Sequence, residues 1–473
     1  MNQALLRPLW LCVALASLAG CTLGPDYQRP ETAAPVIRQE PVEGWKVATP
    51  ADLAPREDWW TIYQTPSINA LMVQLESANQ SLQAADAQYR QARALVARTR
   101  SELFPQVGSS ASAVRSSSGT NSPANQYSAG LNANWELDVW GRVRRSLESN
   151  RAQAESSAAQ RAAVKLSLQS ELAVTFLQLA TLDRQIDIYD RTLQAYQRAL
   201  QLTKNKYEAG VVRKSDVIQA ETQLYSTQAT RIDLNWQRAQ AENAIAVLTG
   251  QVAGGFSVPK QSDLPTLPAI PDQLPADLLE RRPDVAAAER KVMAANAQIG
   301  VAETAWFPTI SLGGRVGYNN DHIGGLISSP NRYWSLGPQA ALTLLDFGGR
   351  KADLERNEAA YDQTVAEYRQ TVLQAIEEIE NNWVQLRVLS AEESSQLKAL
   401  ESAQEALRLM ELQYKAGTVD YLDVINLQTT MLNTERAHLA LRSNRLAASM
   451  RLMASLGGGW NKGEEVVVGT QEQ

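Results

Sequence analysis

Residues 127–139, YSAGLNANWELDV, alternate between apolar side chains and polar ones or glycine over thirteen positions without a break. The apolar set is Tyr127, Ala129, Leu131, Ala133, Trp135, Leu137 and Val139. Because successive side chains of a strand point to opposite faces, this pattern predicts one extended strand with an apolar and a polar face. It is longer than most strands of soluble domains, and it suits a tilted strand that crosses a bilayer, which takes roughly 9–11 residues.

The composition excludes several classes of protein. The chain has 473 residues, a net charge of −6, two histidines and two cysteines. Both cysteines, Cys12 and Cys21, lie near the N-terminus, which excludes a disulfide framework and a cysteine-based metal site. After residue 20 no run of 18 apolar residues occurs, so a membrane would have to be crossed by strands. No catalytic constellation stands out, and we expect no enzyme, no cofactor and no metal site.

The N-terminus has the order of a secretory signal over residues 1–20: a positive charge at Arg7, a short apolar segment, then small residues. The sequence LAGC at 18–21 resembles a lipobox and predicts lipid attachment to Cys21. An ordinary signal cut nearby, with Cys21 incidental, is the alternative. By resemblance to bacterial lipoproteins, Thr22 in the next position favours sorting to the outer membrane. Residues 21–66 contain seven prolines and are expected to form an extended arm.

The rest of the chain consists of two copies of one unit, offset by slightly more than 200 residues. The matching segments are Phe104-Pro105 with Phe307-Pro308, DVWGR at 138–142 with DFGGR at 346–350, KYEAG at 206–210 with QYKAG at 413–417, DVI at 216–218 with DVI at 423–425, and AVLTG at 246–250 with ASLGG at 454–458. We therefore expect a first repeat over 67–256, a linker over 257–276, a second repeat over 277–458 and a tail over 459–473.

Each repeat is predicted to contain a helix ending at the Phe-Pro pair, two strands, a very long helix, a short turn at Ala-Gly and a last helix. Residues 143–208 and 351–415 lack proline and glycine and carry apolar side chains at coiled-coil spacing. Each would be a helix of about 65 residues and, at 1.5 Å per residue, close to 100 Å long. The strands are expected near 107–115, 127–139, 309–319 and 334–344, the first being the weakest because it is small and polar.

Four strands cannot close a barrel, since outer-membrane barrels begin at about 8 strands. An open sheet would leave unpaired strand edges in lipid, at a cost of several kcal/mol for each unsatisfied group. We therefore expect an α+β fold, a two-repeat protomer whose copies share a transmembrane β-barrel, continued by a long α-helical coiled-coil barrel. The strand side chains expected to face the membrane are Leu131, Trp135, Leu137, Leu342 and Leu344.

The chain resembles the outer membrane efflux protein family, and within it the lipidated outer-membrane factors of resistance-nodulation-division pumps. The resemblance rests on the lipobox with PDYQRP at 25–30, the two Phe-Pro pairs, WGR at 140–142 with GGR at 348–350, and the two Tyr-x-Ala-Gly turns followed by Asp-Val-Ile. It implies a homotrimer lipid-anchored in the bacterial outer membrane, with its helices forming a periplasmic tunnel. It also implies docking to a periplasmic adaptor protein and an inner-membrane transporter.

The turns between the long and the last helices are the candidate functional sites. Gly210 and Gly417 mark these turns, where an adaptor is expected to dock. Asp216 and Asp423 follow six residues later, and in an oligomer each becomes a ring of negative charge that narrows the pore and binds cations. The alternative is ordinary placement of aspartate in the first turn of a helix, typically worth about 0.3–1 kcal/mol.

The resemblance adds two residues to this gate. Asn426 stands at the next position inward from Asp423, where relatives often carry aspartate, so a second acidic ring is not expected. Tyr414 matches a tyrosine that in similar proteins hydrogen-bonds the first-repeat aspartate, here Asp216. Val419 stands where some relatives have a linking arginine, and that link is expected to be absent.

The expected function is a passive exit duct for small molecules such as drugs, toxic organic compounds or metal ions, driven by an inner-membrane pump. A duct for type I protein secretion is the alternative within the family, and the lipobox and proline-rich arm favour the small-molecule duct. A lipid-tethered periplasmic coiled-coil scaffold is the alternative from another class. It would explain the helices but not four alternating strands.

Overall fold

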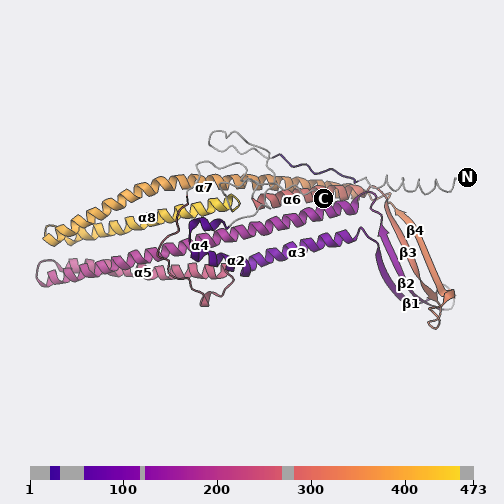
Figure 1. Cartoon of the computed structure of the whole chain (residues 1–473), viewed down its shortest axis with the longest axis horizontal. Helices are drawn as coiled ribbons and strands as arrows, with labels where there is room; N and C mark the ends of the chain where they lie inside the picture. Colours follow the sequence, from indigo (N-terminus) through magenta and orange to yellow (C-terminus); the bar gives the residue numbers. More distant parts are fainter. Residues whose placement is uncertain (1–21, 32–57, 118–122, 269–281, 459–473) are drawn as a thin grey trace. The chain divides into compact units, whose positions relative to one another are not determined.

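The computed structural model describes residues 22–31, 58–117, 123–268 and 282–458 (Figure 1). In chain order its elements are η1 (Trp59–Tyr63), α2 (Pro66–Ala78), α3 (Gln80–Ser101), β1 (Gln106–Ser116), β2 (Ala124–Glu136), α4 (Arg142–Glu208), α5 (Lys214–Leu248), η2 (Ala253–Gly255), α6 (Pro283–Thr304), β3 (Thr309–Asn320), η4 (Ser329–Asn331), β4 (Arg332–Ala341), α7 (Gly349–Ala416) and α8 (Tyr421–Ser455). The predicted signal peptide, Cys21 and the predicted tail lie outside the described residues, as do parts of the arm and linker.

The order of elements confirms the α+β class and the two-repeat plan. Helix, two strands, long helix and last helix occur once from α2 to α5 and again from α6 to α8. The long helices α4 and α7 have 67 and 68 residues, close to the lengths expected from their uninterrupted coiled-coil spacing. None of the described helices is apolar enough over a sufficient length to cross a membrane.

The chain divides into two compact units, which do not coincide with the repeats. The strand unit is made of Met1–Ala33, Asp86–Gln160 and Asp284–Thr371. The tip unit is made of Ala34–Ala85, Arg161–Pro283 and Val372–Gln473. Each unit therefore draws on both repeats.

The strand unit contains one antiparallel sheet in the order β1-β2-β3-β4. Its central pair, β2 and β3, joins the two repeats in a register that sets Trp135 opposite Leu312. Gly130 lies opposite Gly317 in this pair, and a Cβ on Gly317 would come within 2.5 Å of the Ala129 carbonyl oxygen. The two backbones therefore approach so closely that only glycine fits at this point.

The second strand ends earlier than the alternation predicts. β2 stops at Glu136, so Leu137 directly follows the strand, and its backbone N–H still donates a hydrogen bond of 2.8 Å to the Ile310 carbonyl oxygen of β3. Its place on the membrane face stays a prediction. The cause of the early end is Asp138, whose carboxylate accepts hydrogen bonds from the backbone N–H groups of Val143 (2.8 Å) and Arg144 (2.9 Å) at the start of α4. A side chain that caps the next helix requires the chain to leave the sheet.

The fourth strand is shortened in the same way. β4 ends at Ala341, so Leu342 and Leu344 follow the strand, and both are exposed. The carboxylate of Asp346 accepts a hydrogen bond of 2.9 Å from the backbone N–H of Arg350 in the first turn of α7. The aspartates of DVWGR and DFGGR thus play the same capping role in the two repeats.

The first predicted helix, near 68–103, is two helices. α2 ends at Ala78, and Asn79 has an extended backbone with ψ of 124°. The Asn79 side chain accepts a hydrogen bond of 3.0 Å from the backbone N–H of Leu82 and donates one of 2.9 Å to the carbonyl oxygen of Leu248. The asparagine therefore caps α3 and fastens it to the end of α5, a contact between distant segments that the local pattern does not indicate.

The largest core of the tip unit gathers side chains from several helices, including the middle of α4. Its fully buried side chains come from η1, α2, α4, α5 and α8, and include Tyr63, Ile68, Met72, Leu75, Phe176, Leu177, Ile245, Leu446 and Met450. The hydroxyl of Tyr63 shares a hydrogen bond of 2.9 Å with the hydroxyl of Ser449, which satisfies the one polar atom that this ring buries.

Candidate functional site

Two turns of the tip unit have the same backbone geometry. Gly210 and Gly417 have φ of +74° and +81°, in the left-handed region that glycine adopts without strain. The backbone N–H of the following residue bonds back across the turn in both cases, from Val211 to Lys206 at 2.8 Å and from Thr418 to Gln413 at 3.1 Å. This arrangement satisfies helix-end carbonyl groups, and it explains why both long helices stop at Ala-Gly.

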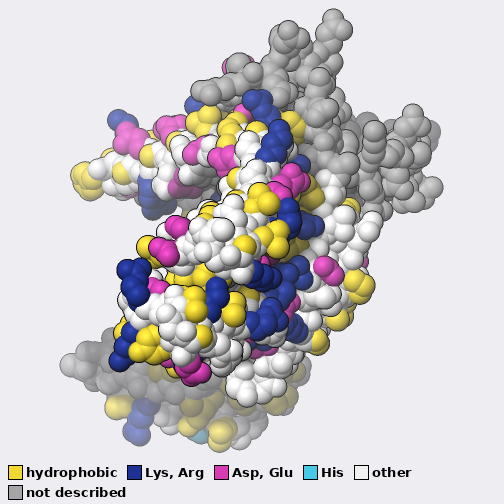
Figure 2. Space-filling view, turned by 90° about the vertical axis from the view of Figure 1, so that its left-hand side faces the viewer, with side chains coloured by type: hydrophobic (Ala, Val, Ile, Leu, Met, Phe, Trp, Pro, Cys, Tyr) yellow, Lys and Arg dark blue, Asp and Glu magenta, His cyan; other side chains and the backbone are white. Residues whose placement is uncertain are grey.

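A small core lies beneath these turns and joins the two repeats. Its buried members come from α4, α5, α7 and α8: Tyr196, Leu200, Ala220, Leu224, Tyr414, Tyr421 and Val424. The rings of Tyr414 and Tyr421 have their centroids 5.4 Å apart. Burial, with smaller contributions from Tyr414 and Tyr196, raises the pKa of Tyr421 to about 12. Seen from this end of the helices, the surface mixes hydrophobic, acidic and basic side chains (Figure 2).

Asp216 is held by its own turn. Its carboxylate accepts a hydrogen bond of 3.2 Å from the backbone N–H of Arg213 and another of 3.2 Å from the hydroxyl of Ser215. The side chain is 16% exposed. Such bonds are usual for an acidic residue in the first turn of a helix. They therefore agree with the alternative given above, in which Asp216 stabilises the helix start and has no role in a gate.

Tyr414 makes different contacts from those that the resemblance implies. Its hydroxyl lies 3.5 Å from the hydroxyl of Thr203 on α4. Lys206, also on α4, places its ammonium 3.7 Å from the centre of the Tyr414 ring and donates a hydrogen bond of 3.1 Å to the Tyr414 carbonyl oxygen. Within the protomer, Tyr414 is therefore connected to α4, while the carboxylate of Asp216 serves its own turn.

Lys206 is the residue that sequence reasoning missed. It stands in KYEAG where the second repeat has Gln413 in QYKAG, so the difference between the repeats was the available signal. Its partner is more than 200 residues away in the chain, and the contact requires the two hairpins to pack together.

Asp423 and Asn426 lie on the exposed surface of α8. Asp423 is in the first turn of the helix, and both side chains are exposed. They are three residues apart, so they lie on one face of the helix. Their role in a constriction stays a prediction.

The segment after Cys21 is seated in the strand unit, and we name residues 22–31 the N-terminal strap. The guanidinium of Arg145 donates hydrogen bonds to the carbonyl oxygens of Leu23 (2.9 Å) and Gly24 (3.1 Å). A Cβ on Gly300 of α6 would lie 2.8 Å from the Leu23 carbonyl oxygen, so the strap crosses this helix in direct backbone contact. Arg145 is 4% exposed, so the strap supplies partners for a buried charge.

A second buried charge fixes the far end of the strap. Glu289 on α6 accepts a hydrogen bond of 2.7 Å from Arg29 and one of 3.3 Å from the hydroxyl of Tyr27. Burial, then the neighbouring charge of Glu289, raises the pKa of the Tyr27 hydroxyl. No cluster of His, Cys, Asp or Glu within the described ranges is placed to hold a metal ion.

Of the side chains predicted to face the membrane, Leu131 and Trp135 lie in β2, four residues apart and hence on one face. Leu131 is exposed, whereas the indole N–H of Trp135 donates a hydrogen bond of 2.9 Å to the carbonyl oxygen of Leu103. Sequence alternation thus located the sheet, while the contact of Trp135 depends on the chain segment before β1.

Known proteins share this architecture over nearly the whole chain. The sequence model of the outer membrane efflux protein family matches residues 71–251 and 274–458. The chain is similar to the antibiotic efflux pump outer membrane protein ArpC of Pseudomonas putida, with 30% identity over 97% of this chain and 96% of that protein. It is 29% identical to the cation efflux system protein CusC of Escherichia coli, over 95% of this chain and 98% of that protein.

A solved structure agrees with the fold. The outer-membrane channel OprN superposes with a TM-score of 0.85 at 33% identity, covering 93% of this chain and 100% of that one. The repeats, the four strands and the long helices are therefore those of a channel protomer. The chain belongs to the outer membrane efflux protein family.

Proposed function

We propose that this chain is the protomer of the outer-membrane channel of a tripartite efflux system, a passive duct through which an inner-membrane pump expels small molecules. The observation that carries the proposal is the four-stranded sheet, in which β1 and β4 are the outer strands of the described chain. Edges of this kind cannot stay unpaired in lipid. Copies of the chain can pair β1 with β4 and close the sheet, and the family resemblance favours three copies.

The relatives support a duct that selects little among small molecules. One is named for antibiotic efflux and another for cation efflux, at nearly equal identity to this chain. A duct whose close relatives serve such different cargo leaves the choice of substrate to the pump. The small-molecule duct is therefore preferred over a duct for secreted proteins.

The remaining parts of the assembly follow from the positions of the predicted residues. Cys21 would carry the lipid that anchors the strap, and the periplasmic adaptor and resistance-nodulation-division transporter would approach the turns at Gly210 and Gly417. Outer-membrane lipid would contact Leu131 on β2. Leu342 and Leu344, exposed just after β4, would lie close to the membrane surface.

A gate at the tips would combine a charge ring with a mechanical link. Asp423 and Asn426 supply exposed polar groups that repeat around the axis of an oligomer. Lys206 and Tyr414 tie the first hairpin to the second within each copy. Asp216 fixes the start of α5 by accepting a hydrogen bond from the Arg213 backbone N–H, and this supports the adjacent link between Lys206 and Tyr414.

Planar-bilayer conductance of the purified lipidated protein tests the proposal. A small, discrete, cation-selective conductance that rises in Asp423→Ala is the expected result. Discrete conductance unchanged by that substitution would keep the duct and remove Asp423 from the gate. A folded oligomer that stays silent, even with Asp216 and Asp423 both replaced by alanine, would contradict the duct and favour the tethered scaffold.

A further inference from the structure

The two faces of the β-sheet differ in their chemistry. On one face, which we name the apolar face, most side chains are hydrophobic: Leu131, Trp135, Ile310, Leu312, Val316, Trp334 and Leu336. The other, which we name the polar face, gathers small polar side chains and one arginine: Ser112, Ser128, Asn132, Asn134, Ser311, Arg315, Asn319, Ser335 and Gln339. When such a sheet is part of a barrel in a membrane, the apolar face contacts lipid and the polar face lines the lumen.

The polar face carries one uncompensated charge. Among the described strands, the charged side chains on this face are Glu136 and Arg315. Glu136 is neutralised by Arg142, whose guanidinium donates hydrogen bonds of 2.8 Å and 2.7 Å to its two carboxylate oxygens. Arg315 is exposed and has no ion pair or side-chain hydrogen bond with another described residue. Each copy of the chain therefore places one free positive charge on this face.

The surroundings of Arg315 leave room for a ligand. Its partners across the sheet are Asn132 on β2 and Ser335 on β4, which supply an amide and a hydroxyl group. Gly313 lies two residues away on the same face of β3, and it pairs with Gly337 on β4. A Cβ added at either glycine would meet no atom within 4 Å. The polar face is therefore open beside the guanidinium.

Tyr333 borders this open patch on the other side. It pairs with Gly317, which is two residues from Arg315 on the same face of β3. The Tyr333 hydroxyl would lie 3.0 Å from a Cβ on Gly317 and 3.1 Å from a Cβ on Gly130 of β2. The tyrosine side chain therefore lies across β3 from β4 to β2, and its hydroxyl adds another hydrogen-bond donor to the polar face.

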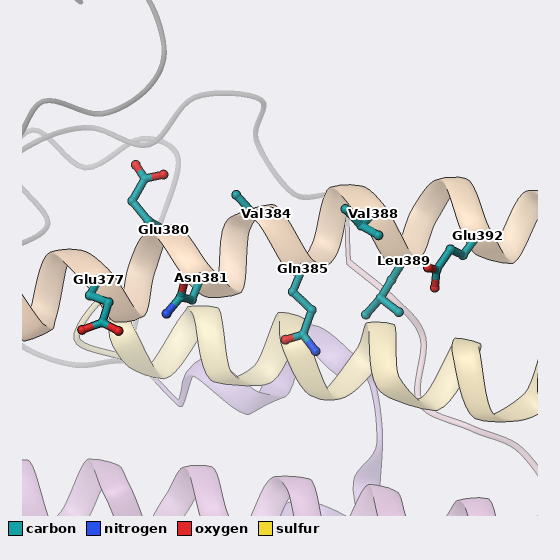
Figure 3. A pocket seen from close by; sticks show the side chains of 8 residues that line it. All are labelled: Glu377, Glu380, Asn381, Val384, Gln385, Val388, Leu389 and Glu392. Atoms are coloured by element: carbon teal, nitrogen blue, oxygen red, sulfur yellow. The ribbon is translucent and has the colours of Figure 1, made fainter.

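Unpaired charge by itself does not make a binding site, and the pocket beside α7 is an example (Figure 3). Its lining includes the carboxylates of Glu377, Glu380 and Glu392, none of which is paired with another described residue. These side chains stand on the surface of a long helix, where solvated carboxylates are usual. Arg315 differs because it is a single cation among small uncharged groups, on a face that a closed barrel would enclose.

We propose that Arg315, together with Asn132, Ser335 and Tyr333, forms a binding site for the oxyanion groups of solutes on the wall of the duct. A guanidinium presents its N–H donors in a planar fork that matches two oxygens of a carboxylate or phosphate. The amide and the two hydroxyl groups can donate to the remaining oxygens. The proposal rests on the proposed duct, because only in a duct does the polar face meet solutes in transit.

Thiol labelling at Gly337→Cys measures the charge of this site without removing any of its groups. The two native cysteines are Cys12, in the predicted signal, and Cys21, the predicted lipid site, so the mature chain would carry no other free thiol. In the membrane-embedded protein at low salt, an anionic methanethiosulfonate reagent should react faster relative to a cationic one. Adding Arg315→Gln should lower this rate ratio roughly 2–5-fold, and 1 M salt should remove most of the difference.

Competition with citrate tests whether oxyanions bind. At constant ionic strength, citrate should slow the anionic reagent at Gly337→Cys when Arg315 is present and have no such effect with Arg315→Gln. Arg315→Lys keeps the charge but loses the planar fork. It should therefore preserve the rate ratio and require roughly 2–5-fold more citrate for the same protection.

Arg332→Gln is the matched control, because it removes the same charge from an exposed position on the apolar face of β4. It should leave the rate ratio and the citrate protection unchanged. A rate ratio that Arg315→Gln does not alter, or that Arg332→Gln lowers equally, would overturn the site. Citrate protection that persists in Arg315→Gln would also overturn it.

Further outcomes separate the site from the function. If Leu336→Cys reacts with both reagents while Gly337→Cys stays unreactive, the apolar face meets water and the site is overturned. If the conductance is normal but Arg315→Gln changes neither labelling nor protection, the site fails and the duct stands. If labelling and protection follow the expected pattern but the folded oligomer never conducts, the anion site is supported and the proposed duct is contradicted.

Discussion

The ammonium of Lys206 lies 3.7 Å from the centre of the Tyr414 ring and 3.1 Å from the Tyr414 carbonyl oxygen. That carbonyl belongs to the last turn of α7, where unpaired carbonyl groups attract a positive charge. Lys206 itself comes from the last turn of α4. One side chain thus joins the ends of the two long helices within a protomer.

Removing this link is expected to loosen the tip. Lys206→Ala loses a cation–π contact and a helix-end hydrogen bond, together worth about 1–2 kcal/mol. If the link holds a closed state, the ratio of open to closed channels rises roughly 5–30-fold. Single-channel open probability in a planar bilayer measures this ratio.

Lys204→Ala is the matched control for that experiment. Lys204 lies two residues away, and its ammonium pairs with Glu221 at 2.9 Å inside the first hairpin alone. Its removal should leave the open probability unchanged. An equal rise in both variants would show that loss of a positive charge at the tip, and not the link to Tyr414, opens the channel.

The two tip aspartates are expected to differ in what they control. Asp216 is hydrogen-bonded within its own turn. Asp216→Ala should therefore lower the free energy of unfolding by about 0.5–1 kcal/mol, with little change in the ion selectivity of the channel. Asp423 is exposed, so Asp423→Ala should leave stability within about 0.5 kcal/mol and reduce cation selectivity. Thermal unfolding and reversal potentials in a salt gradient measure the two effects. Loss of selectivity in Asp216→Ala alone would reverse the assignment.

The sequence predicted the elements well because their signals are local. Period-2 alternation located β2, and the absence of proline and glycine located α4 and α7. The ends of the strands were harder to predict. Asp138 and Asp346 read as polar positions in a strand or turn, but their carboxylates cap the following helices and end the sheet early.

The site could be predicted only in part. Gly210 and Gly417 mark turns because their left-handed backbone is a local requirement. The partner of Tyr414 depends on how two hairpins pack, and no local pattern of α4 distinguishes Lys206 from Lys204. The strap likewise depends on Arg145 and Glu289, which come from different helices.

Alkaline pH is expected to weaken the small core beneath the turns. The pKa of Tyr421 is raised to about 12 in the folded protein, above its ordinary value of about 10. Its stabilising contribution is fully present below the ordinary pKa and is lost as pH rises from there through the folded value. Between about pH 10 and pH 12, the free energy of unfolding should therefore fall less steeply in Tyr421→Phe than in the wild-type protein.

Tyrosinate absorbance followed together with circular dichroism measures that effect. In the wild-type protein, some of the rise in tyrosinate absorbance should occur only at the high-pH end of the titration, together with the loss of the helical circular dichroism signal. Tyr207→Phe is the control, because Tyr207 is exposed on the surface of α4. A variant Tyr421→Phe that loses helix over the same pH interval as wild type would contradict the prediction.

The substitution Gly300→Ala tests the strap, because helix propensity and the steric contact with the strap predict opposite changes in stability. The residue lies inside α6, where alanine is ordinarily more stable than glycine by about 0.8–1 kcal/mol. In the folded protein a Cβ at this position would lie 2.8 Å from the Leu23 carbonyl oxygen and 3.1 Å from the Arg145 guanidinium. We expect the clash to win, so that Gly300→Ala destabilises by about 1–3 kcal/mol.

Hydrogen exchange then shows whether the strap is the part that yields. In Gly300→Ala the backbone N–H of Leu23, which bonds the Trp140 carbonyl oxygen in wild type, should exchange faster. Lys291→Ala, at an exposed position of the same helix, should change neither stability nor exchange appreciably. A more stable Gly300→Ala protein would mean that helix propensity outweighs the contact, and that the strap does not press on α6 as the structure places it.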